Sequence, residues 1–315
     1  MTSEAAPLLE IRNLVVEFGR RGKKTRAIDN VSFIVNKGET FGIVGESGSG
    51  KTTIGRSIIR LNPTAGGDII YKGKRINGRL STAEDKQLTR EIQMIFQDPM
   101  SSLNERAKVD YLVGEGLYNS GMQKEERRKL VMQSLRDVGL RTEFAGRFPH
   151  EFSGGQRQRI GIARCMVMQP ELIVADEPIS ALDVSIRAQV LNLMSRLQRE
   201  RGLTYIFISH DLSVMRFICD RIACLHKGVV VELADTETLY QNPVHPYTKA
   251  LLSAIPEPDP DREKNKTLLT YNGNSRGYSK DKLIWSEIEP GHFVNGTAEE
   301  LAGWVKESPP PSLRA

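Results

Sequence analysis

The stretch Gly45-Glu46-Ser47-Gly48-Ser49-Gly50-Lys51-Thr52 fits the pattern G-x-x-x-x-G-K-[ST] at every fixed position. Residues 39–44 before it are typical of a short buried strand, and residues 53–61 after it place apolar side chains at helical spacing. In this context the pattern wraps an anion, because glycines free the backbone and the helix start presents N–H groups. The stretch therefore predicts a phosphate-binding loop in an α/β fold.

Two acidic residues follow a second predicted strand. Residues 171–176 form an apolar run that ends at Asp176, and Glu177 comes next. Alone, such a pair fits an exposed turn. Ligands bind at the carboxyl ends of strands in open α/β sheets, so beside a phosphate loop the pair predicts a reactive site. We expect Asp176 to hold Mg²⁺, directly or through water, and Glu177 to polarise an attacking water. Lys51 is expected to reach the β- and γ-phosphates and Thr52 to ligate Mg²⁺.

Length and composition are those of an ordinary globular protein. The chain has 315 residues, and its 44 basic and 39 acidic residues leave a net charge of +5, which does not imply nucleic acid as a partner. No run of about 18 apolar residues is found, so no membrane-spanning helix is predicted. Residues 1–7 lack a signal pattern, from which we expect a cytosolic chain. Cys165, Cys219 and Cys224 lie within apolar runs and are expected to be buried free thiols without a metal.

Other sequence patterns predict strands and helices before and after the loop. Strands are predicted over residues 14–18, 31–35 and 204–209, with a hairpin over 68–76. From residue 98 to about 165 helical patterns predominate, which predicts a helical insert. An amphipathic helix is predicted over 184–201, closed by Gly202. The alternation favours a mostly parallel α/β sheet with right-handed crossovers, beside a smaller antiparallel β subdomain.

The chain changes character near residue 255. Pro256, Pro258 and Pro260 mark a break, so we divide the sequence into a main domain over residues 8–255 and an extension over residues 256–315. The extension is polar with scattered apolar anchors, which fits either a small appended subdomain or a partly disordered tail. The run Pro309-Pro310-Pro311 predicts loose chain.

A second anion-binding motif lies inside the predicted helical insert. Phe152-Ser153-Gly154-Gly155-Gln156 precedes a helical run over residues 160–168. A Ser-Gly-Gly helix start offers free N–H groups, a hydroxyl and a favourable dipole. One ATP does not need two such sites from one chain. The simplest interpretation is that this motif serves the nucleotide of a partner subunit.

Together these motifs resemble the ATP-binding subunits of ABC transporters, over roughly residues 8 to 240. The phosphate loop, Gln97, residues 153–156, the pair at 176–177, residues 180–183 and His210 occur in the family's order and spacing. The resemblance implies an ABC-type ATPase core with an antiparallel β subdomain and a helical insert. It also implies that two subunits close head-to-tail around two ATP molecules.

The resemblance assigns roles residue by residue. Ser153 and Gly155 would contact the γ-phosphate bound by the opposite subunit, and Asp183 would cross the interface. Gln97 would sense Mg²⁺ and the attacking water, and its loop would touch the membrane subunits. His210 would hold the γ-phosphate and orient Glu177. The expected nucleotide-binding set is Gly45, Glu46, Ser47, Gly48, Ser49, Gly50, Lys51, Thr52, Thr53, Phe18, Gln97, Ser153, Gly154, Gly155, Gln156 and Asp183.

The resemblance also implies an adenine contact, a set of Mg²⁺ ligands and a set of catalytic residues. Phe18 matches the aromatic residue that stacks on adenine in the family, although a core phenylalanine on a strand is the alternative. The Mg²⁺ ligands implied are Thr52, Gln97 and Asp176. The catalytic residues implied are Glu177, His210, Gln97 and Lys51.

A closer resemblance lies among peptide importers. Residues 94–99, 101–104, 242–252 and 289–293 look like segments of the oligopeptide and dipeptide permease branch, and the whole chain is similar to its F-type ATP-binding subunits. This implies a D-type ATP-binding partner in a heterodimer, two membrane permease subunits, an extracytoplasmic peptide-binding protein and a peripheral place at the cytoplasmic face of the membrane. Several relatives hold an iron–sulfur centre in a C-terminal cysteine cluster. This chain has no cysteine after Cys224, so no cluster is expected, and His245 and His292 are expected to make structural hydrogen bonds.

Alternative functions remain open at this point. Dipeptides, nickel chelates or opines are possible cargoes within the branch, because the cargo pocket lies in other subunits. A soluble ABC ATPase acting on ribosomes or DNA usually has two tandem cassettes or a long coiled-coil insertion, and neither pattern is found. A non-catalytic regulatory cassette is disfavoured by Glu177 and His210.

Overall fold

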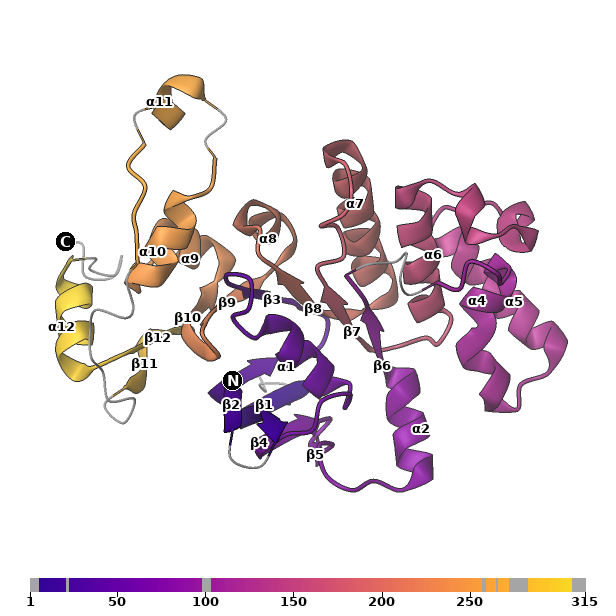
Figure 1. Ribbon diagram of the computed structural model, residues 1–315, viewed down its shortest axis with the longest axis horizontal. Helices are drawn as coiled ribbons and strands as arrows, with labels where there is room; N and C mark the ends of the chain where they lie inside the picture. Colours follow the sequence, from indigo (N-terminus) through magenta and orange to yellow (C-terminus); the bar gives the residue numbers. More distant parts are fainter. Residues whose placement is uncertain are drawn as a thin grey trace, which may run out of the picture.

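The computed structural model describes residues 6–20, 23–97, 103–256, 259–264, 266–271 and 283–307. In these ranges the strands form two sheets (Figure 1). The smaller sheet is antiparallel, with the order β2 (Lys23–Val35), β1 (Leu9–Arg20), β4 (Gly66–Tyr71) and β5 (Lys74–Arg75). The larger sheet has the order β11 (Ile284–Glu289), β12 (His292–Gly296), β10 (Val229–Asp235), β9 (Arg221–His226), β3 (Thr40–Val44), β8 (Thr204–Ser209), β7 (Leu172–Asp176) and β6 (Ile92–Ile95).

The larger sheet confirms the predicted parallel core. Strands β9, β3, β8, β7 and β6 pair with one another in parallel in this order, as crossover helices between them require. At the other end β10, β12 and β11 continue the sheet in antiparallel fashion, which the sequence analysis did not foresee. The turn between β9 and β10 is Lys227-Gly228, and both residues have positive φ angles, of 44° and 82°. A two-residue turn of this kind is typical of hairpins, and its glycine was the available signal.

The helices agree with the main predictions. The helix expected over residues 184–201 is α7 (Val184–Arg201), and Gly202 ends it in a left-handed conformation with φ 63°. The other helices are α1 (Lys51–Ile58), α2 (Thr82–Glu91), α4 (Val109–Gly114), α5 (Lys124–Asp137), α6 (Gly154–Met166), α8 (Leu212–Ile218), α9 (Thr236–Gln241), α10 (Pro246–Ser253), α11 (Pro260–Lys264) and α12 (Ala298–Glu307). Within the described ranges, no helix is both long and apolar enough to cross a bilayer.

The core lies on both faces of the large sheet. Successive side chains of a strand point to opposite faces, so in β8 Ile206 and Ile208 join the cluster under the small sheet. Tyr205 and Phe207 join the cluster under the helices instead. Strand β7 is also fully buried, which explains its continuous apolar sequence. Figure 1 shows α4, α5 and α6 grouped at one end of the sheet, beyond β6 and β7.

The C-terminal part of the chain continues the large sheet at its opposite end (Figure 1). The β11–β12 hairpin pairs with β10, and Trp304 of α12 is buried against Val244 and Val294. Residues 284–307 form the β11–β12 hairpin and α12, which join the large sheet at β10. Residues 309–311, expected to be loose, lie outside the described residues. The domain boundary at residue 255 stays a prediction.

The three cysteines are free and buried, as predicted. Burial raises the pKa of Cys165 to about 12, and it also raises the pKa of Cys219 and Cys224. Because only the thiolate is nucleophilic, these raised pKa values keep the three thiols unreactive near neutral pH. We expect no thiol of the folded protein to react with a disulfide reagent at pH 8, and all three to react in denaturant. A fast native reaction would contradict this arrangement.

Candidate active site

Strand register brings the predicted reactive residues to one edge of the sheet. Val44 pairs with Ser209, and Ile208 pairs with Asp176, so β3, β8 and β7 end side by side. Ile95 pairs with Ala175, which places the end of β6 at the same edge. The residues that follow these strands are the phosphate loop, His210, Glu177 and Gln97. Segments far apart in the sequence therefore form one site at the carboxyl edge.

The phosphate loop is shaped by glycines that no other residue could replace without strain. A Cβ on Gly45 would lie 2.1 Å from the carbonyl oxygen of Leu225, and Gly45 has φ 157°. A Cβ on Gly50, with φ 109°, would lie 2.8 Å from the carbonyl oxygen of Ala27. Gly50 precedes α1, whose first turn has neither a side-chain cap nor an acidic residue. The N–H groups of this turn therefore remain available to an anion.

Two polar side chains of the loop region are buried. The Ser49 hydroxyl has no hydrogen-bond partner among the described residues. The Lys51 ammonium donates to the carbonyl oxygens of Gly45, at 2.7 Å, and Glu46, at 2.8 Å. Burial lowers the pKa of Lys51, while Glu177 and Asp176 oppose that shift. A buried cation held by two carbonyl groups is stabilised when an anionic ligand binds beside it.

Asp176 and Thr52 form an oxygen-rich pair beside Lys51. The Thr52 hydroxyl donates to Asp176 Oδ1 at 2.9 Å, and Asp176 is only 2% exposed. Burial raises the pKa of the Asp176 carboxyl, although the Thr52 hydrogen bond lowers it. A buried carboxylate next to a hydroxyl is the oxygen donor set that Mg²⁺ prefers, so the residues present fit this ion.

Glu177 is held in place by both its backbone and its side chain. Its φ of 45° is uncommon for a residue other than glycine. The Glu177 N–H donates to Ile208 O at 2.9 Å, and its carbonyl oxygen accepts from the Ser180 hydroxyl at 3.1 Å. Gln97 Nε2 donates to Glu177 Oε2 at 3.1 Å, and His210 Nδ1 lies 3.2 Å from Glu177 Oε1. These contacts fix the carboxylate beside the phosphate loop, consistent with a role in positioning water.

The second anion motif lies in a different part of the chain. Ser153 caps α6: its hydroxyl accepts from Gln156 N at 3.4 Å, and Gln156 Oε1 accepts from Ser153 N at 3.0 Å. A Cβ on Gly155 would lie 2.4 Å from Ile186 Cγ2, so glycine permits close packing of α6 against α7. Helix α6 packs on α4, α5, α7 and β6, whereas α1 packs on β2, β7 and β8. The two motifs therefore belong to separate surroundings.

The other predicted residues lie at the surface. Phe18 on β1 is 45% exposed, so it is not a core residue; its adenine contact stays a prediction. Asp183 precedes α7, is exposed and makes no side-chain cap. Ser153 and Gly154 are also exposed. Residues 98–102, part of a segment that resembles peptide importers, lie outside the described residues.

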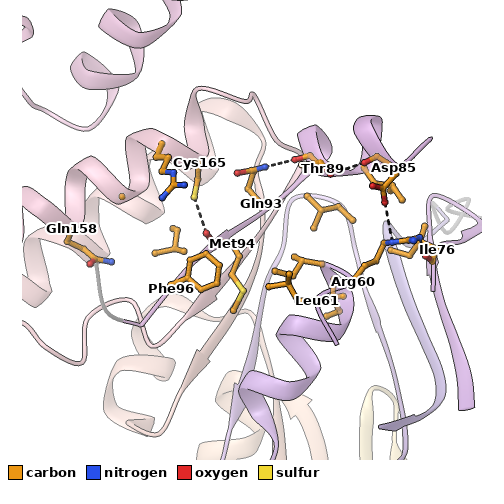
Figure 2. Close-up of a pocket in the computed structure, with 17 residues that line it drawn as sticks. Arg60, Leu61, Ile76, Asp85, Thr89, Gln93, Met94, Phe96, Gln158 and Cys165 are labelled. Carbon is orange, nitrogen blue, oxygen red and sulfur yellow. Dashed lines mark hydrogen bonds and ion pairs between the residues drawn. The ribbon is translucent and has the colours of Figure 1, made fainter. Parts of the chain in front are cut away.

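A cavity of about 350 Å³ opens at Phe96, between the end of α1, α2, β6 and α6 (Figure 2). It is mostly apolar and is lined by Leu61, Leu88, Ile92 and Phe96, among others. At one side Arg60 and Asp85 form an ion pair at 3.5 Å. At the other, Cys165 Sγ donates to Met94 O at 3.3 Å. The pocket thus bridges the sheet and the helical region.

The structure adds a contact that the sequence analysis did not assign. The Tyr247 hydroxyl, from α10, accepts the N–H of Glu46 in the phosphate loop at 3.0 Å. Residues 242–252 were noted only for their resemblance to peptide importers. No local pattern links Tyr247 to a loop 201 positions away in the chain.

Comparisons with known proteins identify the chain's class. Fold and site define a phosphate-loop ATPase of the ATP-binding-cassette type. Residues 28–180 match the family described as ABC transporter, and residues 231–280 match the oligopeptide/dipeptide transporter C-terminal region. The chain belongs to the ABC transporter family, and it is similar over most of its length to oligopeptide transport ATP-binding proteins.

Relatives and solved structures support this assignment. The oligopeptide transport ATP-binding protein AmiF of Streptococcus pneumoniae serotype 4 is 59% identical over 301 residues, which cover 95% of this chain and 98% of AmiF. OppF of Streptococcus pyogenes serotype M1 is 58% identical over 302 residues, covering 95% and 98%. A dimeric ATP-binding cassette, solved in a post-hydrolysis state with ADP and Pi, has a TM-score of 0.64 and 31% identity, and covers 72% of this chain and 98% of its own.

Proposed function

We propose that this protein is the ATP-hydrolysing subunit of a membrane importer of oligopeptides. One observation carries the proposal: Gln97, Glu177 and His210 meet at the sheet edge that bears the phosphate loop. The two most similar relatives named above are oligopeptide transport proteins, which favours oligopeptides as cargo. The match at residues 231–280 covers dipeptide transporters as well, so dipeptides are the second candidate.

The roles proposed for the site follow from its contacts. Lys51 would exchange its two carbonyl partners for the β- and γ-phosphates, and the N–H groups at the start of α1 would bind them too. Glu177, oriented by His210 and Gln97, would accept a proton from the attacking water. Thr52, Asp176 and Gln97 would hold Mg²⁺, which neutralises phosphate charge when bound. The proposed ATP-binding domain spans residues 8–255, with a C-terminal extension beyond it.

The proposed site is completed by a second ATP-binding subunit. The start of α6 is exposed, is capped by its own residues and has surroundings separate from those of α1. A head-to-tail dimer would bring Ser153 and Gly155 of one subunit to the nucleotide of the other. The solved relative is itself a dimer. We propose a D-type subunit as the partner, in a heterodimer.

The cavity in Figure 2 is the surface we propose for a membrane permease subunit. Its apolar lining suits a short helix of that subunit, and Phe96 is exposed there next to Gln97. Motion of Gln97 on ATP binding would then reach the permease directly. We propose accordingly that the protein is peripheral at the cytoplasmic face of the membrane, where it would work with two permease subunits and, indirectly, a peptide-binding protein.

Transport by the assembled complex tests the function. The chain should be co-purified with its partner subunits, reconstituted in vesicles and supplied with MgATP and a labelled oligopeptide. We expect peptide uptake with MgATP and none with a non-hydrolysable analogue. Uptake that is equal with both nucleotides, or uptake of labelled dipeptides alone, would contradict the proposal.

Ser153→Arg should block dimer closure and leave ATP binding to the isolated subunit unchanged. The bulky cation would occupy the space of the opposite nucleotide, so we expect ATP turnover of the complex to fall at least tenfold. Equilibrium MgATP titration and steady-state turnover measure the two effects. Ser81→Arg is the matched control, because Ser81 caps α2 with the same type of box but has no proposed nucleotide contact. Loss of ATP binding by the isolated Ser153→Arg subunit would overturn the partner role.

A further inference from the structure

Tyr247 is a buried residue that reaches the phosphate loop from the C-terminal part of the chain. Its side chain is 1% exposed, and its hydroxyl accepts the Glu46 N–H at 3.0 Å. Burial raises the pKa of Tyr247, so the hydroxyl remains neutral at physiological pH. A neutral hydroxyl inside the protein offers the loop one well-defined acceptor.

The Glu46 residue is held from two directions. Tyr247 binds its N–H, and Lys51 binds its carbonyl oxygen at 2.8 Å. If Lys51 turns toward a phosphate, as proposed above, its hold on that carbonyl group weakens. At that moment the contact from Tyr247 remains and keeps Glu46 in position. The hydroxyl therefore helps to preserve the loop conformation while the lysine changes partners.

Tyr247 is itself held by the C-terminal region. Its own N–H donates to His245 Nδ1 at 3.0 Å. The buried carboxylate of Glu232 accepts from Val244 N at 2.8 Å, from His245 N at 3.0 Å and lies 2.8 Å from His292 Nε2. His292 belongs to β12, so one carboxylate ties the C-terminal hairpin to the start of α10. These contacts confirm that His245 and His292 make structural hydrogen bonds.

Aromatic rings complete this connection. The ring of Tyr247 lies 4.3 Å from that of His226 and 5.6 Å from that of Tyr271, between centroids. The His245 ring lies 5.1 Å from that of Trp304 on α12. Tyr271 and Trp304, from two different segments of the chain, thus pack around the first turn of α10.

From these contacts we infer that Tyr247 is a positioning residue for the phosphate loop, through which the C-terminal hairpin sets the loop's affinity for ATP. The inference rests on the proposed function, because it takes residues 45–52 as the nucleotide site. It gives the C-terminal extension a part in nucleotide binding in addition to its place at the end of the sheet. Tyr247 touches the loop backbone, and no contact with the reacting atoms is assigned to it.

Tyr247→Phe tests the hydroxyl alone, because the ring and its packing remain. We expect the Kd of the isolated subunit for MgATP to rise about 3- to 10-fold, as loss of one hydrogen bond predicts. In the assembled transporter KM for ATP should rise similarly, with kcat within about twofold. Hydrogen exchange at the Glu46 amide should accelerate. Tyr205→Phe is the matched control: this tyrosine is also fully buried, and its hydroxyl has no hydrogen-bond partner among the described residues.

The outcomes separate this inference from the proposed function. Wild-type protein that fails to bind MgATP would overturn the proposed function and the inference with it. Wild-type binding with equal Kd values for Tyr247→Phe and Tyr205→Phe would overturn the inference alone. A change in kcat with unchanged KM would also overturn it, because a loop-positioning role acts on binding.

His292 tests the connection to the hairpin. We expect His292→Ala to raise the Kd for MgATP in the same direction as Tyr247→Phe, and His292→Gln, which keeps an N–H for Glu232, to restore it to within about twofold. A folded His292→Ala protein with wild-type affinity would overturn the link to the hairpin. If His292→Ala does not fold, hydrogen exchange at the Glu46 amide is compared in Tyr247→Phe with and without His292→Gln. Adding His292→Gln should change nothing, because the hairpin acts through the Tyr247 hydroxyl, and a further acceleration would overturn the link.

Discussion

Glu177→Gln is expected to slow ATP hydrolysis by about 10²–10⁴-fold and to leave ATP binding intact. Glutamine keeps the size of the side chain and can still contact His210 and Gln97, but it cannot accept a proton from water. Hydrolysis and ATP binding can be affected separately because the Glu177 side chain is held by groups that follow other strands. Its two carboxylate oxygens lie 3.1 Å from Gln97 Nε2 and 3.2 Å from His210 Nδ1. Steady-state phosphate release and equilibrium MgATP titration measure the two effects.

The control for this variant lies at the other end of the same strand. Glu171 precedes β7 at its amino end and pairs with Lys72, remote from the phosphate loop. Glu171→Gln removes one carboxylate with the same change of charge and should leave turnover within about twofold. Normal turnover in Glu177→Gln, or an equal loss in both variants, would reject the role of Glu177 as the base.

Lys51→Ala is expected to lower ATP turnover by about 10²–10³-fold and to weaken ATP binding as well. The side chain is buried, and within the described residues its ammonium contacts only carbonyl oxygens of the loop. Its removal leaves the phosphates without their nearest cation in a region where few waters can replace it. Turnover and ATP-dependent peptide uptake by the assembled transporter provide the measurement.

Lys74→Ala controls for the loss of one positive charge. Lys74 lies on β5 in the small sheet, is exposed and pairs with Glu84. We expect this variant to hydrolyse ATP at nearly the wild-type rate, because an exposed ion pair contributes little. If the transporter carrying Lys51→Ala takes up peptide at the wild-type rate, ATP-dependent transport does not require Lys51.

The sequence alone predicted features whose residues are close together in the chain. Residues 45–52 run from the end of β3 into the start of α1, so the spacing of glycines and lysine along one short stretch predicts a phosphate loop. The capping box of Ser153 and Gln156 likewise involves residues three positions apart. Helix α7 was predicted with its bounds because an amphipathic pattern and Gly202 both mark its limits.

The antiparallel end of the sheet was not predicted, for a physical reason. Strands β10, β12 and β11 extend the core sheet from β9 by antiparallel pairing, and the apolar residues of β11 are spread among polar ones. The buried Glu232 on β10 breaks the apolar pattern of its strand. Its carboxyl group is surrounded by His292 and two backbone N–H groups, which no local pattern reveals.

By itself the sequence predicted a phosphate-binding loop, because eight consecutive residues contain both the glycines and the lysine of the pattern. Only the tertiary structure decided that Gln97 and His210 both contact Glu177, since this depends on the register between β6, β7 and β8. It also decided that Tyr247 supports Glu46, across 201 positions of chain. Contacts of that range arise from how strands and helices pack, and packing is a property of the whole fold.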